Sequence, residues 1–328
     1  MMQEALRRCV VSWFSGATGV TNAARLSGGA SQETWSFDIV HPGGNIGAIL
    51  RRAPPGYGAA PSRAAGLDAE AILMQRAYDA GVPSPCVLHV LRPQDELGTG
   101  FIMARVEGET IPRKILRDAQ FAEARPKLAR QIGSILAAIH GIDVEQLPDL
   151  RRMTATKEID ELERDYRGFD WPRPVFELAL RWLRERDPGP SQQVTLVHGD
   201  FRHGNLIVGP DGVRAVLDWE LAHTGDPMED LGWVCVNSWR FGEIDKPVGG
   251  FGTREQLFAG YEEAGRRVDP DRVKFWEVMG TLRWGVMCCG MMQRFRIGPE
   301  HSIERAMIGR RSSETEIDLL RLLAPRGK

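Results

Sequence analysis

The chain has 328 residues, a formal net charge of −2 and 26% charged residues, without a long run of one charge. This composition is typical of a globular protein, and it predicts neither a nucleic-acid partner nor binding to an anionic membrane surface. Five scattered cysteines without a Cys-x-x-Cys pair predict reduced thiols in a cytoplasmic protein rather than a disulfide framework. The apolar run 279–292 contains Arg283 and is shorter than the ~20 residues of a membrane span, so we expect a buried helix there.

The first hundred residues have the pattern of a small antiparallel sheet with helices. Apolar residues alternate with polar ones in the first expected strand, and a Pro-Gly-Gly-Asn turn separates it from the second. The expected elements are helices over 1–15 and 63–80 and strands over 35–39, 46–50, 86–91 and 100–106.

A glycine-rich segment containing Gly28, Gly29 and Ser31 precedes the first of these strands. Such a loop lets backbone N–H groups come close to phosphate groups. A plain hairpin corner has the same composition, so this segment alone does not decide between the two interpretations.

Beyond residue 106 the chain is expected to be mainly helical, apart from strands within 194–218. Apolar residues spaced along 128–139 predict one buried helix face, with His140 as a packed or capping residue. Asp226 and the proline after it have the pattern of a helix N-terminus, and Asp230 follows one turn later. We expect both aspartates to have mainly structural roles.

Three polar residues surround the expected strands of this second part. Asp200 and Asn205 follow the apolar run 194–197, five positions apart, and Asp218 ends a predicted hairpin strand. Because the hairpin turn is tight, its two ends lie side by side and Asn205 is expected near Asp218. A lone Asp or Asn between strands is usually a turn former, but three at this spacing favour chemistry. One carboxylate can accept a hydroxyl proton while an amide oxygen and a second carboxylate hold magnesium, as phosphoryl transfer requires.

The sequences His198-Gly199-Asp200 with Asn205, and Leu217-Asp218-Trp219-Glu220, resemble the aminoglycoside phosphotransferase-like family of small-molecule kinases. The resemblance covers about residues 20 to 300. It implies an α+β, bilobal protein kinase-like fold: a small N-lobe (1–105) with an antiparallel sheet and helix, and a larger, mainly helical C-lobe (106–328). Gly199 and Trp219 depart from the protein kinase motifs, and no Ala-Pro-Glu sequence is present. These departures favour a small-molecule acceptor over a protein.

The resemblance also implies roles for single residues in the second part of the chain. Asp200 becomes the catalytic base, and Asn205 and Asp218 become the magnesium ligands. Arg202 stands where many protein kinases carry a lysine that contacts the transferring phosphate, although a surface arginine is an equal alternative. His198 is expected to support the geometry of the loop.

In the first part of the chain, the resemblance implies a nucleotide site covered by the loop of Gly28, Gly29 and Ser31. Arg51 ends a strand where kinases place a phosphate-binding lysine, with Arg52 as the alternative. Glu70 is its expected helix partner, with Asp68 as the competitor. The segment 101–108 resembles the inter-lobe hinge, which assigns Met103 and Arg105 to the nucleotide site.

The leading hypothesis is therefore a phosphotransferase that uses ATP and Mg²⁺ to phosphorylate a hydroxyl of a small molecule. The substitution of arginine at position 51 motivates an alternative, a nucleotide-binding regulatory module without transfer activity. The sequence leaves open the acceptor, the preference for ATP or GTP, and the oligomeric state. Six tryptophans from residue 182 onward are either core residues or the wall of an apolar or cation–π pocket.

Overall fold

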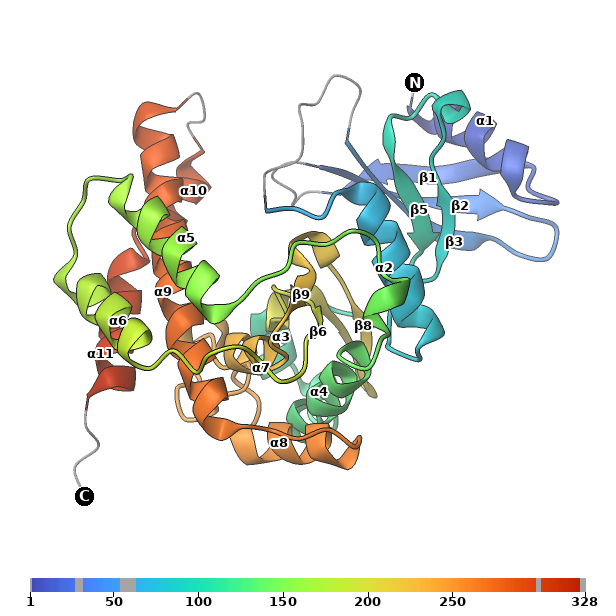
Figure 1. Ribbon diagram of the computed structural model, residues 1–328. Helices are drawn as coiled ribbons and strands as arrows, with labels where there is room; N and C mark the ends of the chain where they lie inside the picture. The colour runs from blue at the N-terminus through green and yellow to red at the C-terminus, as the bar shows by residue number, and fades with distance from the viewer. Residues whose placement is uncertain (1, 27–31, 54–62, 299–301, 325–328) are drawn as a thin grey trace.

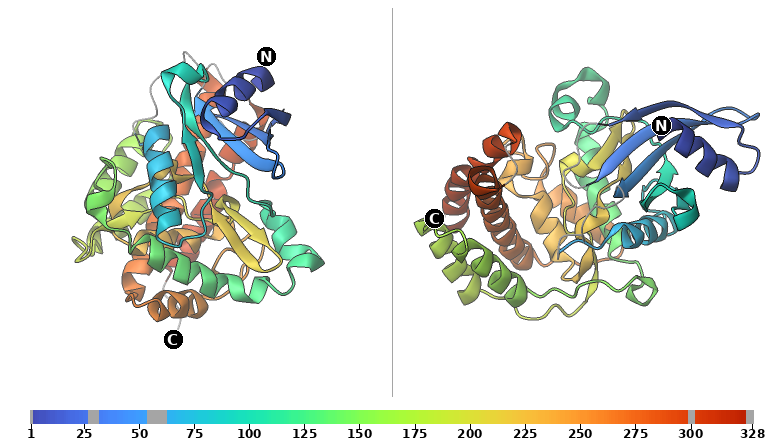
Figure 2. Two further views of the ribbon diagram at one scale, coloured as in Figure 1. Left: turned by 90° about the vertical axis from the view of Figure 1, so that its right-hand side faces the viewer. Right: turned by 90° about the horizontal axis from the view of Figure 1, so that it is seen from above.

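The fold consists of a small β-sheet region followed by a larger helical region (Figure 1). The computed structural model describes residues 2–26, 32–53, 63–298 and 302–324, so Gly28, Gly29 and Ser31 lie outside the described residues. The observed order of elements confirms the predicted α+β, bilobal architecture. Figures 1 and 2 show the sheet at one end of the molecule and helices α5, α6, α10 and α11 at the other.

Five antiparallel strands form the N-terminal sheet in the order β1-β2-β3-β5-β4. The strands are Gly19–Arg25 (β1), Glu33–Val40 (β2), Ile46–Ala53 (β3), Val87–Val90 (β4) and Thr99–Ala104 (β5), and the accompanying helices are Met2–Trp13 (α1) and Leu67–Asp79 (α2). The sequence does not predict β1, because this edge strand is largely exposed and lacks alternating apolar residues. The other four strands lie where the alternation predicts them.

Apolar side chains of the sheet belong to two different cores. Phe37 and Leu50 pack with α1 on one face, whereas Phe101 packs with α2 on the other. Since successive residues of a strand point to opposite faces, Arg51 and Arg52 of β3 must face different cores. The observed register therefore separates the two arginines that the sequence leaves as alternatives.

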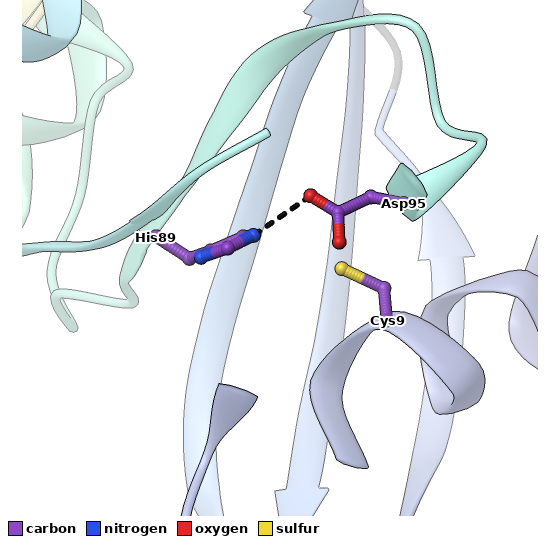
Figure 3. A group of neighbouring side chains, drawn as sticks. All are labelled: Cys9, His89 and Asp95. Carbon is purple, nitrogen blue, oxygen red and sulfur yellow. Dashed lines mark hydrogen bonds and ion pairs between the residues drawn. The ribbon is translucent and has the colours of Figure 1, made fainter. Parts of the chain in front are cut away.

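A cluster of Cys9, His89 and Asp95 joins α1 to the edge of the sheet (Figure 3). His89 Nε2 lies 2.8 Å from Asp95 Oδ2, which also accepts the backbone N–H of Arg92 at 2.7 Å. The His89 ring stacks on Trp13 with 4.7 Å between centroids. Burial raises the pKa of the Cys9 thiol to about 12. These contacts link α1 and β4 to the short helix that contains Asp95, so we interpret the cluster as a structural link.

The helical region starts after β5 and extends to the end of the described chain. Its helices are Pro112–Arg117 (α3), Arg125–Ile139 (α4), Ala155–Arg167 (α5), Pro174–Glu185 (α6), Met228–Val234 (α7), Arg254–Glu263 (α8), Pro270–Ile297 (α9), Ile303–Gly309 (α10) and Ser312–Leu323 (α11). Single 3₁₀ turns are formed by Pro93–Asp95 (η1), Ala119–Phe121 (η2), Val144–Gln146 (η3), His203–Asn205 (η4), Trp219–Leu221 (η5) and Asn237–Trp239 (η6).

Two short strand pairs lie within this helical region. They are Thr195–Val197 (β6) with His223–Gly225 (β9), and Leu206–Gly209 (β7) with Gly212–Val216 (β8). The β7–β8 hairpin is the one predicted around the turn at 209–212. The sequence analysis confines strands to 194–218, so β9 is an addition. It is only three residues long, His-Thr-Gly, and has no apolar alternation.

The apolar run that the sequence assigns to a buried helix lies within α9, as predicted. Residues 275–286 of this helix are all buried, including Arg283, and α7, α10 and α11 pack around it. Among the residues that the structure describes, no helix combines the length and apolarity that crossing a membrane requires. The helix thus forms the central support for the elements that carry the candidate site.

Candidate active site

Asp200 lies in the loop that follows β6, with its side chain 14% exposed. Trp233 Nε1 donates to Asp200 Oδ1 at 2.9 Å, and Asn205 Nδ2 donates to Oδ2 at 2.7 Å. Arg202 Nε lies 3.1 and 3.2 Å from the two oxygens. Each oxygen of Asp200 thus accepts two hydrogen bonds, and the two longer ones share the single N–H of Arg202.

Asn205 and Asp218 lie at the open end of the β7–β8 hairpin. Leu217 N donates to Asn205 O at 2.8 Å, so Asp218 follows directly after the paired position. Its backbone has φ +68°, the left-handed region that few residues other than glycine adopt. Because the amide nitrogen of Asn205 donates to Asp200, its Oδ1 is the atom left for a cation. Amide and carboxylate oxygens are hard donors, so this pair of residues fits Mg²⁺.

Arg51 of β3 reaches from the sheet to the second region. Its Nε lies 3.0 Å from Glu70 Oε2, and its Nη2 donates to Asp218 Oδ1 at 2.7 Å. Arg52 instead binds Glu33 and the carbonyl of Leu97 on the other face of the sheet. The structure therefore places Arg51, and not Arg52, beside the predicted metal ligand.

The carboxylates around Arg51 outnumber it. Glu70 is 1% exposed, whereas its sequence competitor Asp68 is exposed. Burial raises the pKa of Glu70, although the Arg51 guanidinium opposes this shift. Burial and then Asp218 raise the pKa of Glu220 to about 7, and this carboxylate lies 3.7 Å from Arg51. The excess of negative charge makes this a region suited to a cation.

The two predicted hinge residues, Met103 and Arg105, lie in different surroundings. Met103 is nearly buried and lies in β5 opposite Ile49. The backbone N–H of Arg105 donates to Gly47 O at 2.9 Å, and its side chain is paired with Asp38 at 2.8 Å. The backbone N–H and the guanidinium of Arg105 are thus both engaged within the sheet region, and its place in a nucleotide site stays a prediction.

Asp230 of α7 fixes the backbone that leads into the catalytic loop. Its carboxylate is fully buried and accepts the N–H groups of His198 and Gly199 at 2.8 and 3.0 Å. His140 Nε2 is its third neighbour, at 3.1 Å. These contacts fit the structural roles that the sequence predicts for Asp230 and His140. Asp226 similarly accepts from the first residue of α7, which begins at Met228.

Sequence reasoning missed two residues that shape the loop, Trp233 and Arg283. Arg283 Nη2 donates to Gly199 O at 2.5 Å, and Nη1 donates to Glu229 Oε1 at 2.9 Å. Its guanidinium lies 3.9 Å from the centroid of the Trp233 ring, whose Nε1 binds Asp200. An arginine inside the apolar run 279–292 was the available signal, since a buried cation requires partners. No comparable signal marks Trp233 among nine tryptophans.

These features define a protein with the kinase-like fold and a polar loop at Asp200 that is the candidate catalytic loop. The chain belongs to the phosphotransferase enzyme family (APH), whose family model matches residues 22–275.

Three known proteins illustrate its relationships. A putative aminoglycoside phosphotransferase from Ralstonia eutropha JMP134 has a TM-score of 0.74 and 21% identity, with 97% of each chain covered. A thermostable mutant of an aminoglycoside phosphotransferase, solved with AMP-PNP and hygromycin B, has a TM-score of 0.64 and 19% identity, with 98% of this chain and 99% of that chain covered. Mouse acyl-CoA dehydrogenase family member 10 is 32% identical over 199 residues, 57% of this chain. The chain matches only 18% of the length of that relative.

Proposed function

We propose that this protein transfers the γ-phosphate of ATP to a hydroxyl group of a small molecule, with Mg²⁺ as the cofactor. The observation that carries the proposal is the arrangement of Asp200, Asn205 and Asp218 around one loop and hairpin, with Arg51 beside them. A phosphotransferase of the same family and fold is known in complex with AMP-PNP and a small-molecule acceptor, which supports both parts of the proposal.

In this proposal Asp200 accepts the proton of the acceptor hydroxyl. The acceptor oxygen forms the new P–O bond, the bond from the γ-phosphorus to its bridging oxygen breaks, and ADP leaves with that electron pair. Asn205 and Asp218 would hold Mg²⁺, which supplies charge neutralisation of the phosphates when it is bound. Trp233 and Arg202 orient the carboxylate of Asp200, and the proton would replace the longer, shared contact from Arg202.

The test is transfer of label from γ-labelled ATP to a panel of hydroxyl compounds. The panel contains aminoglycosides, macrolides, choline-like amines, sugars, hydroxy acids and hydroxyacyl thioesters of coenzyme A. The thioesters are included because a relative carries the name acyl-CoA dehydrogenase. Label on one class of compound supports the proposal and identifies the acceptor.

Nucleotide binding distinguishes the ways in which this test can fail. ATP that raises the melting temperature without any transfer across the panel would favour the regulatory module over the enzyme. ATP and GTP that both leave the melting temperature unchanged, again without transfer, would contradict the proposed function altogether.

Removal of divalent cations is expected to reduce transfer to background. The donor set of Asn205 and Asp218 consists of hard oxygens, so Mg²⁺ should restore the activity after EDTA treatment. The measurement is the initial rate with EDTA and after Mg²⁺ is added back in excess. The same titration with an Asp218→Asn variant provides the comparison, since the loss of one charge should raise the Mg²⁺ concentration needed for half of the maximal rate. Undiminished transfer in EDTA would contradict the assigned metal ligands.

Replacement of Arg51 by glutamine is expected to weaken ATP binding by roughly tenfold or more, because a charge-assisted contact to phosphate is lost. Arg52→Gln is a matched control. Each variant removes one guanidinium from β3 and one ion pair with a glutamate, Glu70 in the first case and Glu33 in the second. Calorimetric titration with Mg–ATP gives the two affinities, and equal weakening in both variants would show that Arg51 has no special role.

A further inference from the structure

A groove of about 850 Å³ lies beside the catalytic loop, a volume within the range of small-molecule sites. Its lining comes from η6 and the residues after it, from α10 and α11, and from Arg113 of α3. The groove is lined by Arg113, Asn237, Ser238, Phe241, Gly242, Glu304, Met307, Ile308, Arg310, Arg311, Glu314, Ile317, Asp318 and Arg321.

The groove shares its wall with the side chains that surround Asp200. Phe241, which lines the groove, packs edge to face on His203 of the catalytic loop, with 5.9 Å between the ring centroids. Trp239, the last residue of η6, lies in sequence between the lining residues Ser238 and Phe241. The guanidinium of Arg202 lies 5.0 Å from the centroid of its ring. Ile308 packs on the tryptophan cluster that includes Trp233 and Trp239. Asp200 and Arg202 do not themselves line the groove, so an acceptor bound there would extend past Trp239 to bring its hydroxyl to the proposed base.

The charges in the groove are unequally paired. Arg311 lies 2.9 Å from Glu314, and Arg321 lies 3.6 Å from Asp318. Within the described ranges, no side-chain partner is found for the other two lining arginines, Arg113 and Arg310, both of which are exposed. Glu304 is the remaining lining carboxylate. The groove thus offers two unpaired guanidinium groups against one unpaired carboxylate.

Apolar side chains accompany these cations. Met307 and Ile317 are 48% and 54% exposed, and they lie with Phe241 and Ile308 along the same groove. Exposed apolar side chains beside free arginines fit a ligand with an apolar portion and an anionic end. A polycationic acceptor would meet repulsion from Arg113 and Arg310 and only one free carboxylate.

We propose that the acceptor is an anionic hydroxy compound whose carboxylate or phosphate group binds Arg113 and Arg310 and whose apolar portion lies along Met307 and Ile317. This inference rests on the proposed function, because it names the class of molecule that receives the phosphate. It goes beyond that function in separating this protein from enzymes that accept cationic sugars.

The test uses four hydroxyalkyl compounds of the same chain length that end in a carboxylate, a phosphate ester, a primary amide or an amine. We expect kcat/KM for the two anions to exceed that for the amide and the amine by at least tenfold. The ratio between the carboxylate and the phosphate ester identifies which anion the groove recognises. Equal or better use of the amine would overturn the proposal.

Arg113→Gln and Arg310→Gln are expected to raise the KM for the anionic acceptor by roughly tenfold each, since each removes a charge-assisted contact. The KM for ATP should not change, and the KM for the amide acceptor should rise much less than that for the anion. Arg267→Gln is the matched control, an exposed arginine outside the groove that loses the same charge. Unchanged KM in both groove variants would overturn the proposal.

Calorimetric binding of the anionic compounds without ATP separates this inference from the proposed function. Anion binding that weakens in the two groove variants supports the groove assignment even without phosphate transfer, and in that case only the proposed function fails. Transfer to the amide or the amine alone would leave the proposed function standing and overturn the anionic acceptor.

Discussion

Asp200→Asn is expected to lower the rate of phosphate transfer by about 10²–10⁴-fold, the range in which a positioned general base contributes to catalysis. Asparagine has the shape of the aspartate that it replaces and still accepts through one oxygen. It cannot take up the acceptor proton, and its amide hydrogens would oppose one of the donors now directed at Asp200. The effect should therefore appear in kcat, with the affinity for ATP largely retained.

Single-turnover transfer and calorimetric ATP binding measure these two quantities for the same preparation. Asp211→Asn is a suitable control, because Asp211 lies in the exposed turn of the neighbouring hairpin and makes contact only with Arg214 among the side chains described. Transfer by Asp200→Asn at more than a tenth of the wild-type rate would remove Asp200 from the role of base.

Arg283→Met is expected to lower the free energy of unfolding by about 3–5 kcal/mol, the usual cost of removing one partner of a buried ion pair. Methionine keeps much of the apolar volume of the side chain, but the carbonyl of Gly199 loses its donor and Glu229 keeps only His223 as a partner. Trp233 also loses the cation that lies over its ring. Since Trp233 orients Asp200, kcat should fall together with stability.

Urea denaturation gives the stability change, and Arg296→Met provides the comparison, because Arg296 is an exposed residue of the same helix. Arg283→Lys separates the two effects: it keeps a buried positive charge near Glu229 but cannot make both contacts at once. We expect it to recover more stability than activity. A stable Arg283→Met variant with the kcat of wild type would show that Arg283 does not position the loop.

The sequence predicted those parts of the candidate site that depend on local pattern. The five-residue spacing of Asp200 and Asn205 and the tight turn at 209–212 are short-range features, and the structure shows Asn205 bonded to Asp200. The sequence leaves open whether Arg51 or Arg52 faces the candidate site, because a one-residue change in register moves a side chain to the opposite face of the sheet. The observed pairing of β3 with β2 and β5, in which Arg51 lies opposite Phe101, determines the face on which each arginine lies.

What the sequence could not predict depends on contacts between distant segments. Arg283 and Gly199 are 84 positions apart, and no local rule connects them. The groove likewise combines Arg113 with Arg310, which come together only when the helical region has folded. The exposed strand β1 and the three-residue strand β9 are also hard to recognise, because they carry little of the alternation by which strands are detected.

The wall formed by α10 and α11 has a consequence for how this protein can diversify. Asp200, Asn205 and Asp218 come from one continuous stretch of chain, whereas most of the outer wall comes from residues 304–321. If the groove holds the acceptor as proposed, substitutions in that later segment can change its shape and charge without altering any residue proposed to handle the phosphate. Selection can thus act on substrate choice and on reaction chemistry through separate parts of the gene.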